Sequence, residues 1–575
     1  MLRRTFLNGV GALVLAMAAR PMRALAHARG APWDALRKRV GDRLIPVRSP
    51  LLESARTGIG QDAAVLFARL RNPYYLGDDP ALTQTLGWID AWTSQPSLYA
   101  VAARDAADVS AAIDVARTHA LRLVVKGGGH SYFGNSNAAD SLLVWTRAMD
   151  EVQLHETLRG VDWPAHAEAV PAVSIGAGAL WGRVYRTVSA AGRYVQGGGC
   201  LTVGVAGFVQ GGGFGSLSKT FGTGAANLLE AEVVTADGRV RTVNQFREPD
   251  LFYALRGGGG GTFGVVTRLT LRTHPLPATI GAALFNVTAK DDEAWRVLVA
   301  RTVRFYAETL FNPAWGEQLR FEPGRRLGVS MLCHSLTQAQ VRATWQPFLS
   351  WLKAHPDDYR LDAEPMLIAL PAARFWDPDF LRTLPNVVLT DDRPGAPSAN
   401  VFWATNLGEA GQVLNAYQSA WLPARLLDPS RQVRLVDALL SACREWPVSL
   451  HTNKGLAGGT EAAIAATRET ATNPAVLDAF ALVICAADAP PAWPGIPGHE
   501  PDVAKGRQEA AQVARAMAPI HALVPNAGSY VSEADYFTPN WQQAYWGRHY
   551  ARLLKTKRRY DPTHLFRGHH CVGSE

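Results

Sequence analysis

The chain has 575 residues, of which 47% are hydrophobic and 19% charged, and its formal net charge is +8. This composition is typical of folded globular proteins, and the length favours two to four domains. Beyond the N-terminus no run of about eighteen apolar residues occurs, so we expect no membrane span. The basic residues lack the spacing of a nucleic-acid-binding module, so we expect no nucleic-acid partner.

The first 28 residues have the features of an export signal. Arg3 and Arg4 precede an apolar stretch, and Ala26-His27-Ala28 supplies the small residues that a signal peptidase requires. The paired arginines followed by Phe-Leu resemble the bacterial twin-arginine signal. We expect this machinery to export the folded protein to the periplasm or outside a bacterial cell. Removal of residues 1–28, which hold four arginines and no acid, would lower the charge to +4. The alternative is a helix that stays attached.

Residues 29–93 mix helical stretches with turns and form an N-terminal segment without a motif. From residue 94 the pattern changes to strand, helix, strand and glycine loop, which is typical of an α/β unit. Asp105 is a plausible helix cap, and Asp237-Gly238 has the sequence of a hairpin turn. The elements predict a domain over 94–276, with strands at 98–101, 121–125, 141–145, 172–175, 230–235 and 265–271 and helices at 105–119 and 180–191.

Residues 277–520 lack glycine clusters and predict a second domain that covers the first and selects a substrate. Its expected helices are 297–310, 339–352 and 461–470, and its strands at 320–321 and 327–332 favour a mostly antiparallel sheet. The last segment, 521–575, is aromatic and basic, and we expect it to return to the first domain. The fold class is therefore α+β.

Two glycine-rich segments carry candidate chemistry. Gly127-Gly128-Gly129-His130-Ser131 follows a strand, and its glycines allow backbone N–H groups to approach a pyrophosphate. It is neither a P-loop nor a dinucleotide fingerprint, because the lysine of the first and the acidic residue of the second are missing. His130 alone is more often a packed histidine.

The second segment, residues 197–215, holds nine glycines in nineteen residues. A chain that wraps closely around a planar ligand needs such a composition, since side chains would hold the backbone away. Cys200 lies near its start. The chain has five cysteines, so at least one thiol stays unpaired even where disulfides form, and Cys200 is the candidate. No cysteine or histidine spacing indicates a metal site.

At these residues the sequence resembles the vanillyl-alcohol-oxidase/PCMH-type FAD-linked oxidase family, in its berberine-bridge-enzyme-like branch. The resemblance covers about 94–276 and 526–571 and implies a two-part PCMH-type FAD-binding domain plus a substrate domain. In that branch the histidine of Gly-Gly-His-Ser bonds to the flavin 8α-methyl, and this position is His130. The cysteine of Cys-x-Thr-Val-Gly bonds to flavin C6, and this position is Cys200. The resemblance thus implies a bicovalent FAD.

Other positions of the family carry over in the same way. The residue three after the cysteine faces the re-oxidising side of the flavin, where valine admits O2; here it is Val203, which implies an oxidase, although Val203 could simply be a strand residue. The segment near the adenine places Val266 against FAD. The remaining FAD contacts that the resemblance implies are Gly127, Gly128, Gly129, Ser131, Gly204, Gly207, Gly213, Gly215 and Trp546.

The C-terminal segment also resembles the family, and its ending is similar to a microbial group that includes isoamyl-alcohol-oxidase-like proteins. His549 stands where the family usually has an asparagine beside the flavin. Many relatives have Tyr-x-Asn-Tyr upstream, with tyrosines that help to deprotonate the substrate. Here Tyr530 keeps its place and Glu533 replaces the second tyrosine. A desolvated carboxylate can take a proton, so Tyr530 and Glu533 are the candidate catalytic residues; the alternative is an acidic surface loop.

Together these features predict an FAD-dependent oxidase that takes hydride from a hydroxyl-bearing carbon of a small molecule and reduces O2 to H2O2. Two alternatives stay open: a dehydrogenase that uses another acceptor, and a secreted binding protein without turnover. No feature of the sequence indicates the substrate.

Overall fold

The computed structural model describes residues 30–57 and 60–575, so the predicted export signal lies outside the described residues. Within the described ranges no helix is long and apolar enough to cross a membrane. The first elements of the described part are α3 (Ala31–Val40), η1 (Gly41–Arg43), β1 (Leu44–Pro46), α4 (Pro50–Thr57), α5 (Gly60–Arg69), α6 (Pro73–Gly77), β2 (Thr85–Trp88) and β3 (Trp92–Thr93).

Residues 94–276, here called the glycine-rich domain, contain two sheets. The smaller has the order β1-β4-β6-β5, in which β4 (Tyr99–Ala102), β6 (Ser141–Trp145) and β5 (Arg122–Lys126) run parallel. Helix α7 (Ala106–Thr118) connects β4 to β5, and the Asp105 carboxylate caps it by accepting a hydrogen bond from Asp108 N at 2.9 Å. The predicted strand–helix–strand unit is confirmed.

The second sheet of this domain is antiparallel, with the order β11-β10-β12-β8-β7 and β9 beside β12. Gly238 has a φ of 78° in the turn between β10 and β11, as the Asp-Gly pair predicts. β7 was not predicted, because its side chains are polar or half-exposed on both faces. The elements are β7 (Val152–Leu158), β8 (Val170–Gly176), α8 (Trp181–Ala190), β9 (Arg193–Val195), α9 (Val205–Gln210), α10 (Ser218–Phe221), β10 (Leu228–Val234), β11 (Val240–Asn244), α11 (Pro249–Leu255) and β12 (Val265–Pro275).

Residues 277–520, here called the sheet domain, are built on a large sheet with the order β16-β13-β15-β14-β21-β22-β20-β2-β3 and with β17 also beside β13. Its pairs are antiparallel except β2 with β20, so the mostly antiparallel sheet is confirmed. The strands are β13 (Thr279–Ala289), β14 (Trp315–Glu322), β15 (Arg326–His334), β16 (Tyr359–Leu361), β17 (Met366–Pro371), β20 (Gln412–Pro423), β21 (Val448–His451) and β22 (Ala479–Ala489).

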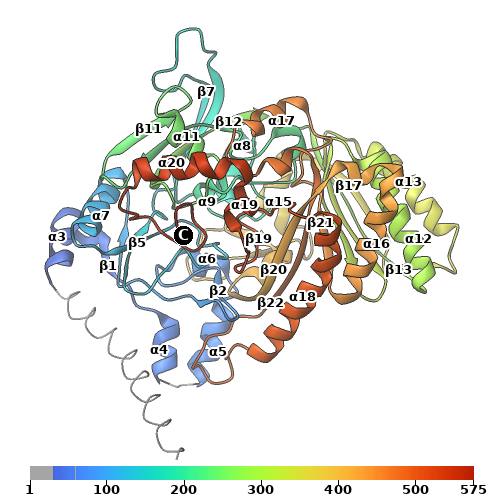
Figure 1. The fold of residues 1–575 in the computed structure, drawn as a ribbon, viewed down its shortest axis with the longest axis horizontal. Helices are drawn as coiled ribbons and strands as arrows, with labels where there is room; N and C mark the ends of the chain where they lie inside the picture. Colours follow the sequence, from blue (N-terminus) through green and yellow to red (C-terminus); the bar gives the residue numbers. More distant parts are fainter. Residues whose placement is uncertain (1–29, 58–59) are drawn as a thin grey trace, which may run out of the picture.

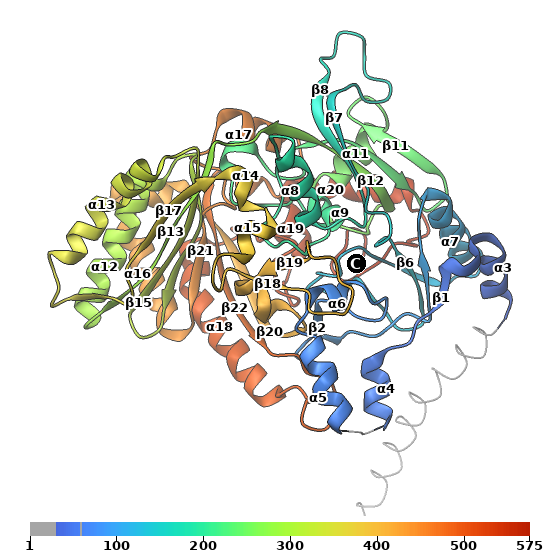
Figure 2. The ribbon, with the colours of Figure 1, turned by 180° about the vertical axis from the view of Figure 1, so that it is seen from behind.

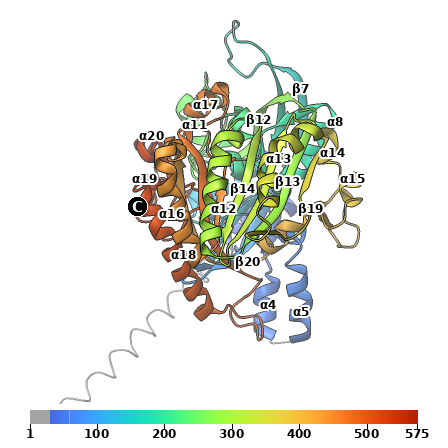
Figure 3. The same cartoon turned by 90° about the vertical axis from the view of Figure 1, so that its right-hand side faces the viewer.

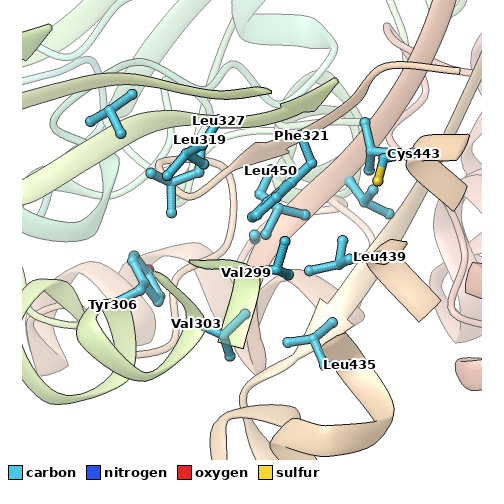
Figure 4. Close-up of a cluster of buried hydrophobic side chains, with 14 of the residues drawn as sticks. Val299, Val303, Tyr306, Leu319, Phe321, Leu327, Leu435, Leu439, Cys443 and Leu450 are labelled. Atoms are coloured by element: carbon cyan, nitrogen blue, oxygen red, sulfur yellow. The ribbon is translucent and has the colours of Figure 1, made fainter. Parts of the chain in front are cut away.

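Helices cover one face of this large sheet (Figure 3). Alternate strand residues such as Leu319, Phe321 and Leu450 pack against Val299 and Leu439 of the helices in a continuous apolar core (Figure 4). The π-helical turn η2 (Tyr306–Leu310) extends the first of these helices. The helices are α12 (Asp292–Phe305), α13 (Gln338–Lys353), α16 (Pro429–Glu445) and α18 (Val503–Leu523).

The opposite face of the large sheet turns toward the glycine-rich domain, so the two domains lie side by side (Figures 1 and 2). Shorter elements fill the space around their junction: α14 (Ala372–Phe375), α15 (Pro378–Arg382), β18 (Val388–Thr390), β19 (Val401–Trp403), η3 (Ala404–Glu409), η4 (Ala424–Leu427), α17 (Glu461–Arg468) and η5 (Pro474–Leu477).

The two ends of the described chain each tie the domains together. β2 and β3 of the N-terminal segment complete the large sheet, whereas β1 joins the glycine-rich domain. The C-terminal segment, with α19 (Trp541–Trp546), η6 (Gly547–His549) and α20 (Tyr550–Tyr560), returns to the glycine-rich domain. There Lys557 Nζ donates to Thr262 O at 2.7 Å, and Phe566 pairs with Leu123.

Candidate active site

A cavity of about 950 Å³ lies between the glycine-rich domain and the face of the large sheet that the helices do not cover. Its lining includes most of the residues singled out from the sequence, although they come from segments hundreds of residues apart. These lining residues are Gly127, Gly128, Gly129, His130, Ser131, Cys200, Val203, Gly204, Gly207, Val266, Tyr530, Glu533 and Trp546.

The two glycine loops touch each other directly at one edge of the cavity. A Cβ on Gly128 would lie 2.7 Å from Gly204 N, and a Cβ on Gly204 would lie 2.7 Å from Gly128 N. Contacts this short exclude any side chain at either position. The close approach therefore explains both glycines and holds His130 and Cys200 on the same edge of the cavity.

Thr202 lies between the two predicted attachment residues. Its Oγ1 is 3.3 Å from Cys200 Sγ and 3.5 Å from His130 Nε2. Burial lowers the pKa of His130 to about 4, so the ring is neutral at physiological pH. Burial, together with the charge of Glu409, raises the pKa of Cys200 to about 11, so its thiol is protonated there.

Glycines of the 197–215 segment serve two different purposes. Gly199 and Gly207 line the cavity, and a Cβ on either would meet no described protein atom within 4 Å. Gly213 and Gly215 are not in the lining, and they are needed for packing inside the domain. A Cβ on Gly215 would lie 1.8 Å from Gly197 O. Gly207, Gly213 and Gly215 were all predicted to contact the cofactor, and the structure places Gly207 in the lining and the other two outside it.

Of the two C-terminal residues expected beside the cofactor, one lines the cavity and the other does not. Trp546 lines the cavity, and its Nε1 donates to Gly257 O at 2.9 Å. His549 is outside the lining, and its Nδ1 lies 3.1 Å from Thr472 O. The position at which the family usually has asparagine therefore supports a neighbouring loop in this chain.

Tyr530 and Glu533 form a tight turn at the end of the cavity where charged side chains gather, here called the polar end. The Tyr530 hydroxyl accepts a hydrogen bond from Gly213 N at 3.2 Å, and burial followed by the charge of Glu533 raises the tyrosine pKa. The Glu533 carboxylate pairs with the Lys454 ammonium. Lys454 was not predicted from the sequence, because no motif marks it in the sheet domain.

Glu317 is a further missed residue, and its backbone explains why. It lies in β14 between Trp315 and Leu319, which face the helices, so alternation would place it in the apolar core. Its φ of 78° turns the carboxylate instead into the cavity, where it accepts hydrogen bonds from Ser216 Oγ at 2.5 Å and Asn453 Nδ2 at 3.2 Å. A left-handed backbone at a glutamate inside a strand is costly and is typical of functional sites.

Glu409 completes the polar end and was also missed. Its carboxylate accepts a hydrogen bond from Asn406 Nδ2 at 2.9 Å. Burial raises its pKa to about 7, and the charge of Glu533 adds to this effect. Tyr132 and Tyr417 stand nearby with ring centroids 5.1 Å apart, and burial raises both tyrosine pKa values. Tyr132 directly follows the Gly-Gly-His-Ser motif, which is the one signal that could have identified it.

The shape and chemistry of the cavity fit a flavin dinucleotide. Its glycine side offers backbone approach without Cβ atoms, and the buried Gln210 Oε1 in the lining has no partner among the described residues. His130 and Cys200 stand together on its edge, and titratable side chains face them from the sheet domain. This combination defines a flavoprotein with a substrate cavity at a domain junction.

Comparisons with known proteins agree with this class. The family models described as "FAD binding domain" and "Berberine and berberine like" match residues 97–244 and 529–573. An uncharacterized FAD-linked oxidoreductase of Arthroderma benhamiae is 30% identical over 83% of this chain and 77% of its own. The VAO-type flavoprotein MtVAO615 of Myceliophthora thermophila has a TM-score of 0.75 at 24% identity, over 96% of both chains.

A third comparison concerns attachment of the cofactor. The glucooligosaccharide oxidase of Acremonium strictum, which is described with a 6-S-cysteinyl, 8α-N1-histidyl FAD, has a TM-score of 0.61 at 20% identity, over 84% of this chain and 92% of its own. At this identity the likeness shows the fold alone.

This chain belongs to the VAO/PCMH-type FAD-linked oxidoreductases, in the berberine-bridge-enzyme-like branch. The predicted family, fold class and FAD cofactor are confirmed. The relative named above is fungal, whereas the export signal led us to expect a bacterial source.

Proposed function

We propose that this chain is an FAD-dependent oxidase that converts a hydroxyl-bearing carbon into a carbonyl and O2 into H2O2. The cavity itself carries the proposal. One edge of it holds His130 and Cys200, and its lining also includes the ion pair of Glu533 and Lys454. Bound FAD would supply the two-electron chemistry, accepting hydride from the substrate carbon and delivering both electrons to O2. The side chains of the cavity would orient the substrate and take the hydroxyl proton.

We further propose that FAD is attached through both His130 and Cys200. A neutral imidazole is the form that can make a new bond through nitrogen, and burial keeps the His130 ring neutral. Thr202 Oγ1 lies 3.5 Å from its Nε2 and helps to orient the ring. The second attachment requires the Cys200 thiol to lose its proton. Burial raises the pKa of this thiol, and the hydrogen bond with Thr202 Oγ1 partly offsets that effect.

The proposed proton acceptor is Glu533, aided by Tyr530. Lys454 fixes the carboxylate by an ion pair, and Ser419 Oγ holds the same turn by donating to Glu533 O at 2.6 Å. A positioned carboxylate at the polar end of a partly dry cavity can accept the substrate proton while hydride leaves the carbon.

Val203 supports the choice of an oxidase over a dehydrogenase. It lines the cavity three residues after Cys200, and its carbonyl accepts a hydrogen bond from Trp181 N at 3.1 Å, which fixes the backbone there. In the family a valine at this position admits O2. We expect Val203→Leu to slow re-oxidation by O2 about tenfold or more while anaerobic flavin reduction keeps its rate.

Attachment can be tested by denaturing and precipitating the purified protein. We expect yellow pellets from the wild type and from the single variants His130→Ala and Cys200→Ala, and a colourless pellet from the double variant. The surface variant His119→Ala is the matched control. Free FAD in the wild-type supernatant would contradict the double attachment, and absence of peroxide with every alcohol tried, despite flavin reduction, would favour the dehydrogenase.

The expected export also remains a proposal, because residues 1–28 lie outside the described residues. The paired Arg3 and Arg4 and the Ala26-His27-Ala28 site support it. N-terminal sequencing of protein secreted by an expression host should find a new terminus near residue 29. A mature protein that keeps Met1 would contradict cleavage.

A further inference from the structure

The wall of the cavity changes its chemistry in order along the large sheet. One row of directly paired residues crosses four strand boundaries from β17 through β13, β15 and β14 to β21: Met366, Leu284, Ser330, Gln318 and His451. Every member of this row lines the cavity. The wall therefore runs from aliphatic side chains at β17 and β13 to polar side chains at β14 and β21.

The neighbouring rows of paired residues extend the apolar surface at the aliphatic end of the wall. Ile368 pairs with Ala282, which pairs with Leu332, and Leu370 pairs with Ile280. Because residues two apart share a face of a strand, these side chains all point the same way and line the cavity. Ile368 and Leu370 are only half-buried, so their apolar surface is left for something that enters the cavity.

A segment at residues 372–409, here called the cover segment, closes the aliphatic end. Trp376 stacks on Tyr185 with centroids 4.7 Å apart, and Trp403 Nε1 donates to Gly199 O at 2.8 Å, directly before Cys200. The lining that residues 375–387 of this segment add is mostly apolar: Phe375, Trp376, Leu381, Leu384, Pro385 and Val387, with Asn386 as the polar member. The last part of the segment adds Trp403 and the polar side chains of Thr405, Asn406 and Glu409, and Glu409 belongs to the polar end.

Hydrogen bonds and an ion pair at Asp391 hold the cover segment in place. The buried Asp391 carboxylate accepts hydrogen bonds from Asn72 Nδ2 at 2.8 Å and Asn400 Nδ2 at 3.0 Å, and it pairs with Arg393 at 2.7 Å. The apolar end of the cavity is therefore a formed wall. At the other end, Glu317, Lys454 and Glu533 gather beside Gln318 and His451.

A sugar is poorly matched to such a cavity. Hydroxyl groups all round a sugar ring would face aliphatic side chains that cannot hydrogen-bond, and buried polar groups without partners are costly. An aromatic or aliphatic body would instead bury apolar surface on both sides, which is favourable. Only one end of the occupant can meet the carboxylates and the ammonium.

We infer that the substrate is an alcohol carried at one end of a bulky apolar molecule, whose ring or chain lies between the β13–β17 wall and the cover segment. This inference rests on the proposed oxidase function and names its substrate class. In the reaction R–CH2OH loses a hydride and a proton to become R–CHO, and O2 takes up both electrons and two protons to become H2O2.

The experiment compares 2-naphthalenemethanol with cellobiose on the full-length holoenzyme. Binding is measured under anaerobic conditions by the shift of the flavin absorbance, and turnover is measured by peroxide release. We expect the naphthyl alcohol to bind at least tenfold more tightly than cellobiose. Ile368→Asn and Leu384→Asn, from opposite walls, should each raise KM for the naphthyl alcohol about tenfold with kcat changed less than twofold. Val433→Asn on the exposed face of α16 is the matched control.

The possible outcomes distinguish failure of this inference from failure of the proposed oxidase function. Binding of the naphthyl alcohol that weakens in both wall variants supports the apolar substrate even if peroxide never appears, in which case the oxidase proposal fails alone. Tighter binding of cellobiose, no spectral shift with either compound, or unchanged naphthyl affinity in both wall variants would overturn the inference.

Discussion

The two walls of the cavity are built by different means. The glycine-rich wall owes its shape to missing side chains, since Gly128 and Gly204 bring two backbones into contact. The sheet wall owes its shape to strand register, because pairing alone decides that Leu284, Ser330 and Gln318 share one row. A local motif therefore encodes the first wall, whereas long-range pairing encodes the second.

This difference assigns separate tasks to the walls. The glycine-rich wall carries His130 and Cys200 and would hold the cofactor, whereas the sheet wall carries the residues that would meet the substrate. Substitutions on the first should change folding and cofactor content, and substitutions on the second should change substrate binding or turnover. The variants below can sharpen or break that division.

The largest effect is expected from Gly215→Ala. The new Cβ would lie 1.8 Å from Gly197 O, and a backbone carbonyl cannot move aside cheaply. We expect a loss of about 3 kcal/mol or more of stability and little folded protein, measured by soluble yield and thermal unfolding. Gly408→Ala, which meets no described atom within 4 Å, is the control. A Gly215→Ala protein as stable as this control would show that the glycine-rich packing is loose.

Lys454→Met addresses the sheet wall. It removes the ammonium that fixes Glu533, so we expect kcat to fall about 10²-fold while FAD content and attachment stay unchanged. Steady-state kinetics and flavin absorbance of the same preparation check both parts. Lys505→Met, which removes an exposed ion pair with Glu509, should leave both values as they are. Loss of flavin from Lys454→Met would break the division between the walls.

The same division explains what the sequence could predict. Helix α7 with its Asp105 cap, the strand β6 and the Asp-Gly hairpin all follow local rules, and the structure confirms them. His130 and Cys200 could be picked because each lies within a glycine-rich segment of known type. Both residues contact Thr202, which is a tertiary arrangement that local rules do not give. Only the resemblance to the family predicted that they would lie close together.

Residues of the sheet wall could not be predicted from local rules. Alternation would direct Glu317 to the helices, and only its left-handed backbone sends the carboxylate into the cavity. Glu409, in the cover segment beside this wall, was missed for another reason: it ends a short 3-10 helix that has no motif. For residues 197–215, the sequence predicted a cofactor-binding segment but not the role of each glycine. Composition cannot distinguish Gly207, which borders the cavity, from Gly215, which packs against Gly197.

Gly207→Ala sharpens this last distinction. No described protein atom lies within 4 Å of the added Cβ, so the apoprotein should keep its melting temperature, whereas the methyl group would project into the space for FAD. We expect about a tenfold loss of FAD occupancy, measured as the ratio of flavin absorbance to protein absorbance. Full occupancy would place the cofactor away from this part of the wall.

The smallest effect is expected from Glu409→Gln, and it depends on pH. Burial raises the pKa of Glu409 to about 7 in the folded protein, against about 4.3 in an unfolded chain. Between these values the folded state binds more protons, so the contribution of Glu409 to stability falls as pH rises from about 4.3 to about 7 and then stays constant. Glutamine cannot ionise, yet it can keep the hydrogen bond from Asn406. We therefore expect Glu409→Gln to melt close to the wild type at pH 4.5 and about 1–2 °C higher at pH 8, while the surface variant Glu500→Gln follows the wild type at both. An equal shift at both pH values would mean that the carboxyl of Glu409 is not held in its neutral form, and that the polar end of the sheet wall is wetter than its burial indicates.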